Sequence, residues 1–155
     1  MTAPCEFRTL VLDRRIEAAP ERVFALMTDP DARRTWGAPG EGIVIEIDQC
    51  DVRDGGREVA RCGPRDAPDF SAVSDFHRVE APRLIVLSET LTVGGNVLSV
   101  SLATQELSAE GSGCQLKVTL QIVSLTGPET FDGYAEGWTG ALDNLVRMAE
   151  AETVQ

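Results

Sequence analysis

Apolar and polar residues alternate through most of the chain, which is the pattern of strands with one buried face. Residues 7–18 form the first such segment, and others follow at 43–48, 57–62, 70–79, 83–93, 97–107 and 114–125. Short stretches rich in glycine, proline or polar residues separate most neighbouring segments from residue 43 onward. Because these connections are short, we expect neighbouring strands to pair antiparallel in one sheet.

Two short helices are predicted between the first two strands. Pro20 suits the first turn of a helix, and Val23, Phe24 and Met27 give that helix one apolar face. Pro30 ends it, because the residue before a proline avoids helical angles. A second helical piece then runs from Pro30 to about Trp36.

The C-terminal segment changes its period. From Thr130 onward, apolar residues recur at three- and four-residue steps: Phe131, Tyr134, Trp138, Leu142, Leu145 and Ala149. This predicts an amphipathic helix of roughly 20 residues, about 30 Å long. Gly133, Gly137 and Gly140 lower its helix propensity, and we interpret them as positions where the helix backbone approaches the sheet closely.

These elements predict an α+β fold in a single domain, residues 1–155. A long helix with one apolar stripe must bury that stripe, and the apolar face of the sheet is its natural partner. We therefore expect a curved antiparallel sheet of about six or seven strands wrapped around the C-terminal helix. The two short helices after the first strand would close one end of the space between helix and sheet.

The charge balance narrows the class of partner. Lys and Arg total 14 against 25 Asp and Glu, so the formal net charge is −11. Such a surface repels phosphate backbones, which argues against nucleic-acid binding. No apolar run approaches the roughly 18 residues that span a membrane, and the N-terminus lacks the pattern of a signal peptide.

The cysteines indicate a reducing compartment. Cys5, Cys50, Cys62 and Cys114 are widely spaced, without a C-x-x-C pair, and His77 is the single histidine. A domain of this length does not need disulfides for stability. We therefore predict four buried free thiols, a cytoplasmic protein and no metal site or other cofactor.

One acid–base cluster is conceivable on the fourth and fifth strands. If the hairpin around "EAP" pairs residue 79 with residue 85, then Asp75, His77 and Glu89 share one face. A change of register by one residue would disperse the cluster. These polar side chains would then face solvent. The chain contains no sequence motif of a hydrolase, a phosphate-binding loop or a dinucleotide-binding loop.

Aromatic residues give a second set of candidates for a binding cavity. Phe131, Tyr134 and Trp138 lie on one face of the predicted C-terminal helix, with Leu142 below them. The tyrosine hydroxyl and the indole N–H could orient a polar ligand group. Trp36 would sit at the end of the same space. Ordinary core packing is the alternative interpretation for all of these side chains.

Four segments carry a family resemblance: "RRIEAAPERVFALMTDPDARRTW", "DVRDGG", "FHRVEAPRLIVLSE" and "GWTGALDNLVRMAE". Together they resemble the START-like, or SRPBCC, superfamily, and within it the branch named after the activator of the ninety-kilodalton heat-shock protein ATPase. The resemblance covers residues 7–150, nearly the whole chain. It implies the helix-grip fold, whose members hold apolar or amphipathic small molecules between helix and sheet.

From the resemblance we expect a binding protein for a small apolar or amphipathic molecule rather than an enzyme. Two alternatives stay open: a cyclase or hydrolase that uses the same cavity, and an interaction protein related to the chaperone activators. The eukaryotic activators carry a further N-terminal domain. This chain begins almost at its first strand, which argues against a co-chaperone role, while a chaperone stays among the expected partners. Exposed strand edges would also allow a homodimer.

Overall fold

The computed structural model describes residues 5–38 and 40–151. Within these residues, seven strands form one antiparallel sheet in the order β1-β7-β6-β5-β4-β3-β2. The strands are β1 (Glu6–Ile16), β2 (Ile43–Cys50), β3 (Arg57–Pro64), β4 (Phe70–Glu80), β5 (Leu84–Val93), β6 (Asn96–Glu110) and β7 (Gly113–Ser124). Strands consecutive in the chain are neighbours from β2 to β7, whereas β1 pairs with β7.

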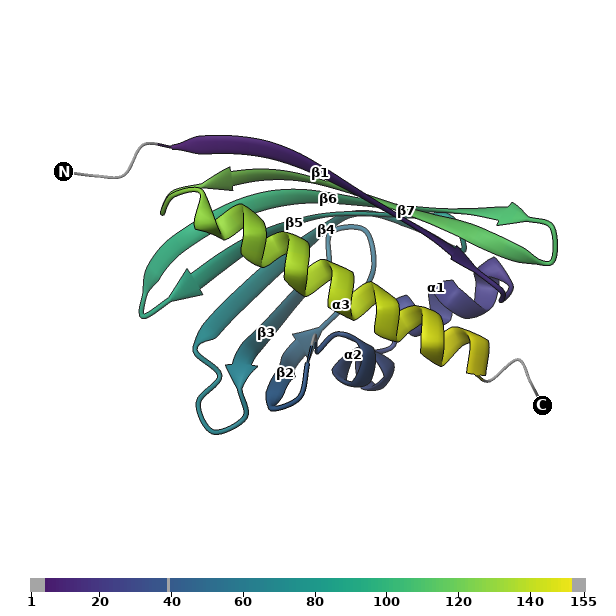
Figure 1. Ribbon diagram of the computed structural model, residues 1–155, viewed down its shortest axis with the longest axis horizontal. Coiled ribbons are helices and arrows are strands. Elements are labelled where there is room, and N and C mark those ends of the chain that lie inside the picture. Colours follow the sequence, from purple (N-terminus) through teal and green to yellow (C-terminus); the bar gives the residue numbers. More distant parts are fainter. Residues whose placement is uncertain (1–4, 39, 152–155) are drawn as a thin grey trace.

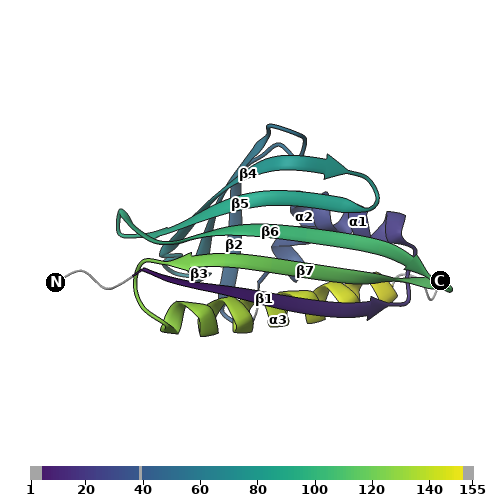
Figure 2. The same ribbon diagram turned by 90° about the horizontal axis from the view of Figure 1, so that it is seen from above.

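The helices lie on one side of this sheet. They are α1 (Pro20–Thr28), α2 (Pro30–Trp36) and α3 (Glu129–Ala151). The sheet curves around α3, which runs along β1 and β7, while α1 and α2 gather at its C-terminal half (Figure 1, Figure 2). This arrangement confirms the predicted α+β helix-grip fold. We call the face of the sheet toward α3 the inner face and the opposite face the outer face.

The first strand leads directly into α1 and α2, which we together call the end closure. Pro20 and Pro30 stand at the first positions of α1 and α2, and the Asp29 side chain caps α2 by accepting from the Asp31 N–H. The Trp36 indole N–H donates to the Leu26 carbonyl at 2.8 Å, which fastens α2 to α1. Both short helices contact α3, so the prediction that they close one end is confirmed.

The core lies between α3 and the strands beside it. Leu116, Val118, Leu120 and Ile122 alternate along β7 and are at most 2% exposed, as the sequence predicted. The α3 side chains that bury against this part of the sheet and the short helices are Phe131, Tyr134, Ala141, Leu142, Leu145 and Ala149. An ion pair between Arg14 and Asp143 at 3.1 Å joins β1 to α3 at the rim of this core.

Two glycines of α3 do not serve close packing. A Cβ atom at Gly133 or Gly137 would meet no heavy atom within 4 Å, so the predicted close approach to the sheet is wrong there. One position where close packing does require glycine is Gly113 at the start of β7. A Cβ atom there would lie 2.2 Å from the Ile16 carbonyl oxygen, because β1 ends against this position.

Part of the outer face carries no charge. Uncharged residues of β1, β7, β6 and β5 stand opposite one another in three rows, which we call the uncharged outer patch. The rows are Phe7, Val123, Val100 and Thr90, then Thr9, Gln121, Leu102 and Ser88, and then Val11, Thr119, Thr104 and Val86. Phe7 is the most exposed large apolar side chain, at 75%.

None of the helices in the described residues combines the length and the apolar character that crossing a bilayer requires.

The two faces of the sheet predict different costs of truncation. Leu120→Ala removes a fully buried side chain and should lower the free energy of unfolding by about 2–5 kcal/mol. Leu102→Ala, on the outer face and 38% exposed, should lower it by roughly 1 kcal/mol or less. Urea denaturation monitored by circular dichroism measures both, and equal losses would contradict the assignment of the two faces.

Candidate functional site

Polar side chains form a continuous row across the inner face. Direct cross-strand pairing connects them through five strands: Cys50, Glu58, Ser74, Glu89 and Ser101, on β2, β3, β4, β5 and β6. We call these five residues the polar row. On β7 the row ends, because Ser101 stands opposite the buried Ile122. Polar groups on an otherwise apolar inner face need partners, so each member of the row requires a physical account.

Glu58 has a charged partner from the end closure. Its carboxylate accepts a hydrogen bond from the Arg33 guanidinium of α2, and the two form an ion pair. Glu58 is only 5% exposed. Burial lowers the pKa of the Arg33 guanidinium, while Cys50 and Glu89 nearby raise it, and arginine stays protonated in this setting. The Cys50 thiol contacts the same Glu58 oxygen at 3.5 Å.

Glu89 has no such partner. Within the described residues, no hydrogen bond or ion pair to its carboxyl group is present, and the side chain is half-buried. Burial raises the pKa of this carboxyl above its ordinary value, and the nearby Arg33 charge offsets only part of that rise. Between Ser74 and Ser101, the polar row therefore contains a carboxyl group in a desolvated setting that the protein's own donors leave unbound.

Tyr134 of α3 reaches the same row from the opposite side. Its hydroxyl lies 2.9 Å from the Ser99 Oγ and donates to the Ser101 Oγ at 3.4 Å. Burial raises the pKa of the Tyr134 hydroxyl, and the Glu89 charge raises it further. The phenol therefore stays protonated at neutral pH and remains a donor within the site.

The inner face differs in accessibility from one side to the other. The inner side chains of β7 and β6 from Ser99 to Leu107 are buried beneath α3 and the short helices. Some inner side chains of β2 to β5 are also buried, among them Ile47, Ala60 and Phe76. Others remain partly exposed although they face the helix side: Ile45, Cys62, Ala72, Leu87, Glu89 and Leu91. We call this set the accessible inner region. Trp138 of α3 is likewise only partly buried.

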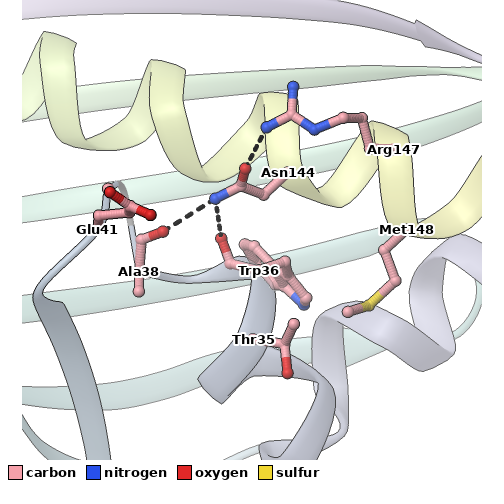
Figure 3. A pocket seen from close by; sticks show the side chains of 8 residues that line it. Thr35, Trp36, Ala38, Glu41, Asn144, Arg147 and Met148 are labelled. Carbon is pink, nitrogen blue, oxygen red and sulfur yellow. Dashed lines mark hydrogen bonds between the residues drawn. The ribbon is translucent and has the colours of Figure 1, made fainter.

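A separate pocket lies at the end closure. It has a volume of about 540 Å³ and is lined by residues of α2, the following loop and α3, among them Trp36, Asn144, Arg147 and Met148. Figure 3 shows the Asn144 amide between the Trp36 and Ala38 carbonyls, to which it donates at 3.4 and 2.9 Å, with Arg147 donating to its oxygen. Most of these polar groups therefore have partners among themselves, and the hydrogen bonds of Asn144 connect α3 to α2 and the loop that follows it.

Comparison with known protein families covers both the polar row and the pocket at the end closure. The profile of the family described as "Activator of Hsp90 ATPase homolog 1-like protein" matches residues 17–150. The chain belongs to this family. The matched range includes α1, α2, every member of the polar row and nearly all of α3.

Several solved structures share the fold of this protein. An uncharacterised protein from Rhizobium leguminosarum superimposes with a TM-score of 0.83 at 26% identity, covering 96% of this chain and 97% of that one. The Mll3558 protein from Rhizobium loti gives 0.82 at 30% identity, with 93% and 98% covered. Protein CV1439 from Chromobacterium violaceum gives 0.81 at 23% identity, with 92% and 96% covered, which shows the fold alone. No curated protein matches the chain.

The structure separates the predicted acid–base cluster. Val79 pairs with Ile85 as expected, but a β-bulge between Phe76 and Arg78 leaves His77 unpaired and shifts the register by one residue. Ser74, not Asp75, therefore stands opposite Glu89. The prediction that the three side chains share one face is wrong.

Asp75 and His77 lie on the outer face instead. Asp75 pairs with Arg57 at 2.9 Å, and both side chains are about half exposed. The His77 Nε2 lies 2.9 Å from the Ser88 Oγ on an exposed part of β5. Of the predicted cluster, Glu89 alone reaches the inner face.

The aromatic candidates divide between core and site. Phe131 is 2% exposed, with the Arg8 guanidinium 4.4 Å above its ring, and Leu142 is 1% exposed, so both are core residues. Trp36 belongs to the end closure. Tyr134 contacts the polar row, and Trp138 packs partly buried against the core cluster. Of the predicted candidates, the structure places Tyr134 and Glu89 near one another.

The cysteine prediction is partly wrong. Cys114 is buried, but Cys50 and Cys62 are half-buried and Cys5 is exposed, all as free thiols. Burial raises the pKa of the Cys50 and Cys62 thiols above the ordinary value, so both stay protonated at neutral pH. Among residues 5–38 and 40–151, no cluster of three or more His, Cys, Asp or Glu side chains could hold a metal ion.

Sequence reasoning missed Arg33, Glu58, Ser74, Ser99 and Ser101. A signal for Glu58 was present, since it is in phase with Ala60 and Cys62 along β3, and period 2 places all three on one face. A charged residue in phase with apolar neighbours indicates a buried polar site. Arg33 had no comparable signal, because its short helix is polar on several sides.

We predict that the Arg33–Glu58 pair is strongly coupled. Arg33→Met alone leaves the Glu58 carboxylate without its partner and should lower the free energy of unfolding by about 3–5 kcal/mol. Arg33→Met combined with Glu58→Met should recover most of this loss. A double-mutant cycle by chemical denaturation measures the coupling, and additive losses would show that the pair is unimportant.

A second prediction concerns pH. Because burial raises the Glu89 pKa, the folded state binds this proton more tightly than the unfolded chain does. The stabilising contribution of Glu89 is fully present below the ordinary glutamate pKa of about 4.3. It is lost as the pH rises through the raised pKa that Glu89 has in the folded state. Glu89→Gln should therefore be more stable than the wild type at pH 7, with the difference shrinking toward about pH 4.

The matched control for this measurement is Glu106→Gln, an exposed carboxyl on β6. It should change the free energy of unfolding little at either pH. A stability difference for Glu89→Gln that is constant from about pH 4 to pH 8 would contradict the burial-driven shift.

Proposed function

We propose that this protein binds a small amphipathic molecule between α3 and the inner face of β2 to β5. The observation that carries the proposal is the polar row, with the unbound Glu89 carboxyl between Ser74 and Ser101 and apolar side chains around it. Binding sites for small molecules are mostly apolar and contain a few placed polar groups. The accessible inner region has this composition.

Neighbouring rows of the sheet supply the apolar surface. Phe76 and Leu87 pair on one side of the polar row, and Ala72 and Leu91 pair on the other. The Ala72 side chain is small and partly exposed. An amphipathic molecule could place its apolar part against these side chains and its polar end at Glu89 and Tyr134.

The packing of α3 supports the same location. The helix packs against β1 and β7 and against both short helices, on the side of the sheet away from β3 and β4. The residues that support the fold and the residues of the accessible inner region are therefore largely different. A ligand in the accessible inner region would contact Ala72 and Glu89, which lie outside the core cluster, and Leu87 and Leu91 at the edge of that cluster.

The proposal predicts that filling the inner face blocks binding. N-phenyl-1-naphthylamine, a neutral apolar fluorophore, should bind the wild type with a rise in fluorescence that saturates at one equivalent. Ala72→Phe projects a large side chain into the accessible inner region and should weaken this binding about tenfold or more. Val73→Phe, one residue along β4 and on the outer face, is the matched control and should leave it unchanged.

Two outcomes would oppose the proposal. One is no saturable binding by the wild type, and the other is equal affinity of the Ala72→Phe and Val73→Phe variants. Native mass spectrometry of the protein purified from its own cells gives an independent measurement. A mass excess that is lost on denaturation would identify the bound molecule directly.

A further inference from the structure

We propose that the polar group of the ligand is a protonated amine, held by the Glu89 carboxylate. This inference rests on the proposed function and narrows it to amphipathic cations. It follows from how charge and hydrogen-bonding capacity are distributed along the polar row.

The charges of the row do not balance. Arg33 is the cation at this part of the inner face, and its ion pair with Glu58 neutralises it. Glu89 then contributes an unpaired negative charge whenever it is ionised. Uncompensated charge in a desolvated setting is unfavourable, so either a proton or a cationic ligand stabilises it.

The neutral groups beside Glu89 are hydroxyls, each of which can accept a hydrogen bond as well as donate one. Ser74 of β4 and Ser101 of β6 stand directly opposite Glu89 on its two sides. An ammonium group carries three donors and no acceptor, so Glu89 and the two hydroxyls could each receive one of its N–H bonds. The strong donor nearby, the Arg33 guanidinium, is already engaged by Glu58.

The charged and titratable groups facing Glu89 come from each element packed around it. They are Arg33 of α2, Glu58 and Cys62 of β3, and Tyr134 of α3. The thiol and the phenol are neutral at pH 7, so Arg33 and Glu58 are the other charges and offset each other. A bound ammonium would therefore meet a net attraction from Glu89, and binding would favour the ionised carboxylate.

The remaining surface suits the rest of such a molecule. Leu87, Leu91 and Trp138 supply apolar area beside the row, and the indole face can also attract a cation. The net charge of −11 favours the approach of cations over that of anions. A fatty acid or another anionic amphiphile would place its carboxylate against Glu89 and be repelled.

Three probes with one alkyl chain and different head groups test the inference: decylamine, 1-decanol and decanoate. Isothermal titration calorimetry at pH 7 should show decylamine binding the wild type at least about tenfold more tightly than 1-decanol, with decanoate weakest. Glu89→Gln should reduce the decylamine affinity to that of 1-decanol. The 1-decanol affinity should stay within about twofold, since the alkyl contacts are unchanged.

Glu106→Gln is the matched control and should leave the preference for decylamine intact. The wild type gives a second readout that needs no variant. Its decylamine affinity should fall as pH is lowered through the Glu89 titration, whereas its 1-decanol affinity should not.

The outcomes separate this inference from the proposed function. If all three probes bind equally, or if Glu89→Gln keeps the preference for decylamine, the amine assignment is wrong. In that case the proposed function would still stand, provided that Ala72→Phe weakens the binding of these probes. If none of the probes binds the wild type, the proposed function itself fails.

Discussion

Burial of the apolar stripe of α3 against the inner face of β7 is the interaction on which the rest of the structure depends. Leu142 and Leu145 lie in the same core as Leu116, Val118 and Leu120 of β7, and all are almost fully buried. This contact fixes the helix across one side of a seven-stranded sheet. Because the sheet curves and the helix is straight, the strands farther from β7 diverge from it (Figure 1).

The residues of the core and those of the polar row therefore come largely from different strands. Side chains of β1, β6, β7 and α3 supply most of the buried apolar area, whereas the polar row is spread over β2 to β6. Arg33 links the two parts, since α2 closes the end of the core and its guanidinium also neutralises Glu58. Ala72 lies outside the core cluster, so under the proposed function a substitution there would change ligand binding at small cost to the core.

The fold was predictable because its patterns are strict. Alternation along β7 and the three- and four-residue spacing in α3 each mark one buried face, and Pro20 and Pro30 mark two helix starts. The site was much less predictable. A β-bulge adds one residue at His77 without any change in composition, yet it moves Asp75 to the outer face and brings Ser74 opposite Glu89. The Arg33–Glu58 pair joins elements 25 residues apart, a contact that local periodicity does not encode.

The uncharged outer patch affects how copies of this protein associate in solution. Largest apolar patches of roughly 300–600 Å² are ordinary for a monomer, and a standard interface buries about 800 Å² on each partner. Between two copies that each carry a net charge of −11, long-range repulsion opposes the close approach that such a patch would favour. Salt shortens the range of that repulsion to about 8 Å at physiological ionic strength. The colloidal stability of this protein therefore depends on the balance between association through the uncharged outer patch and repulsion between negatively charged copies.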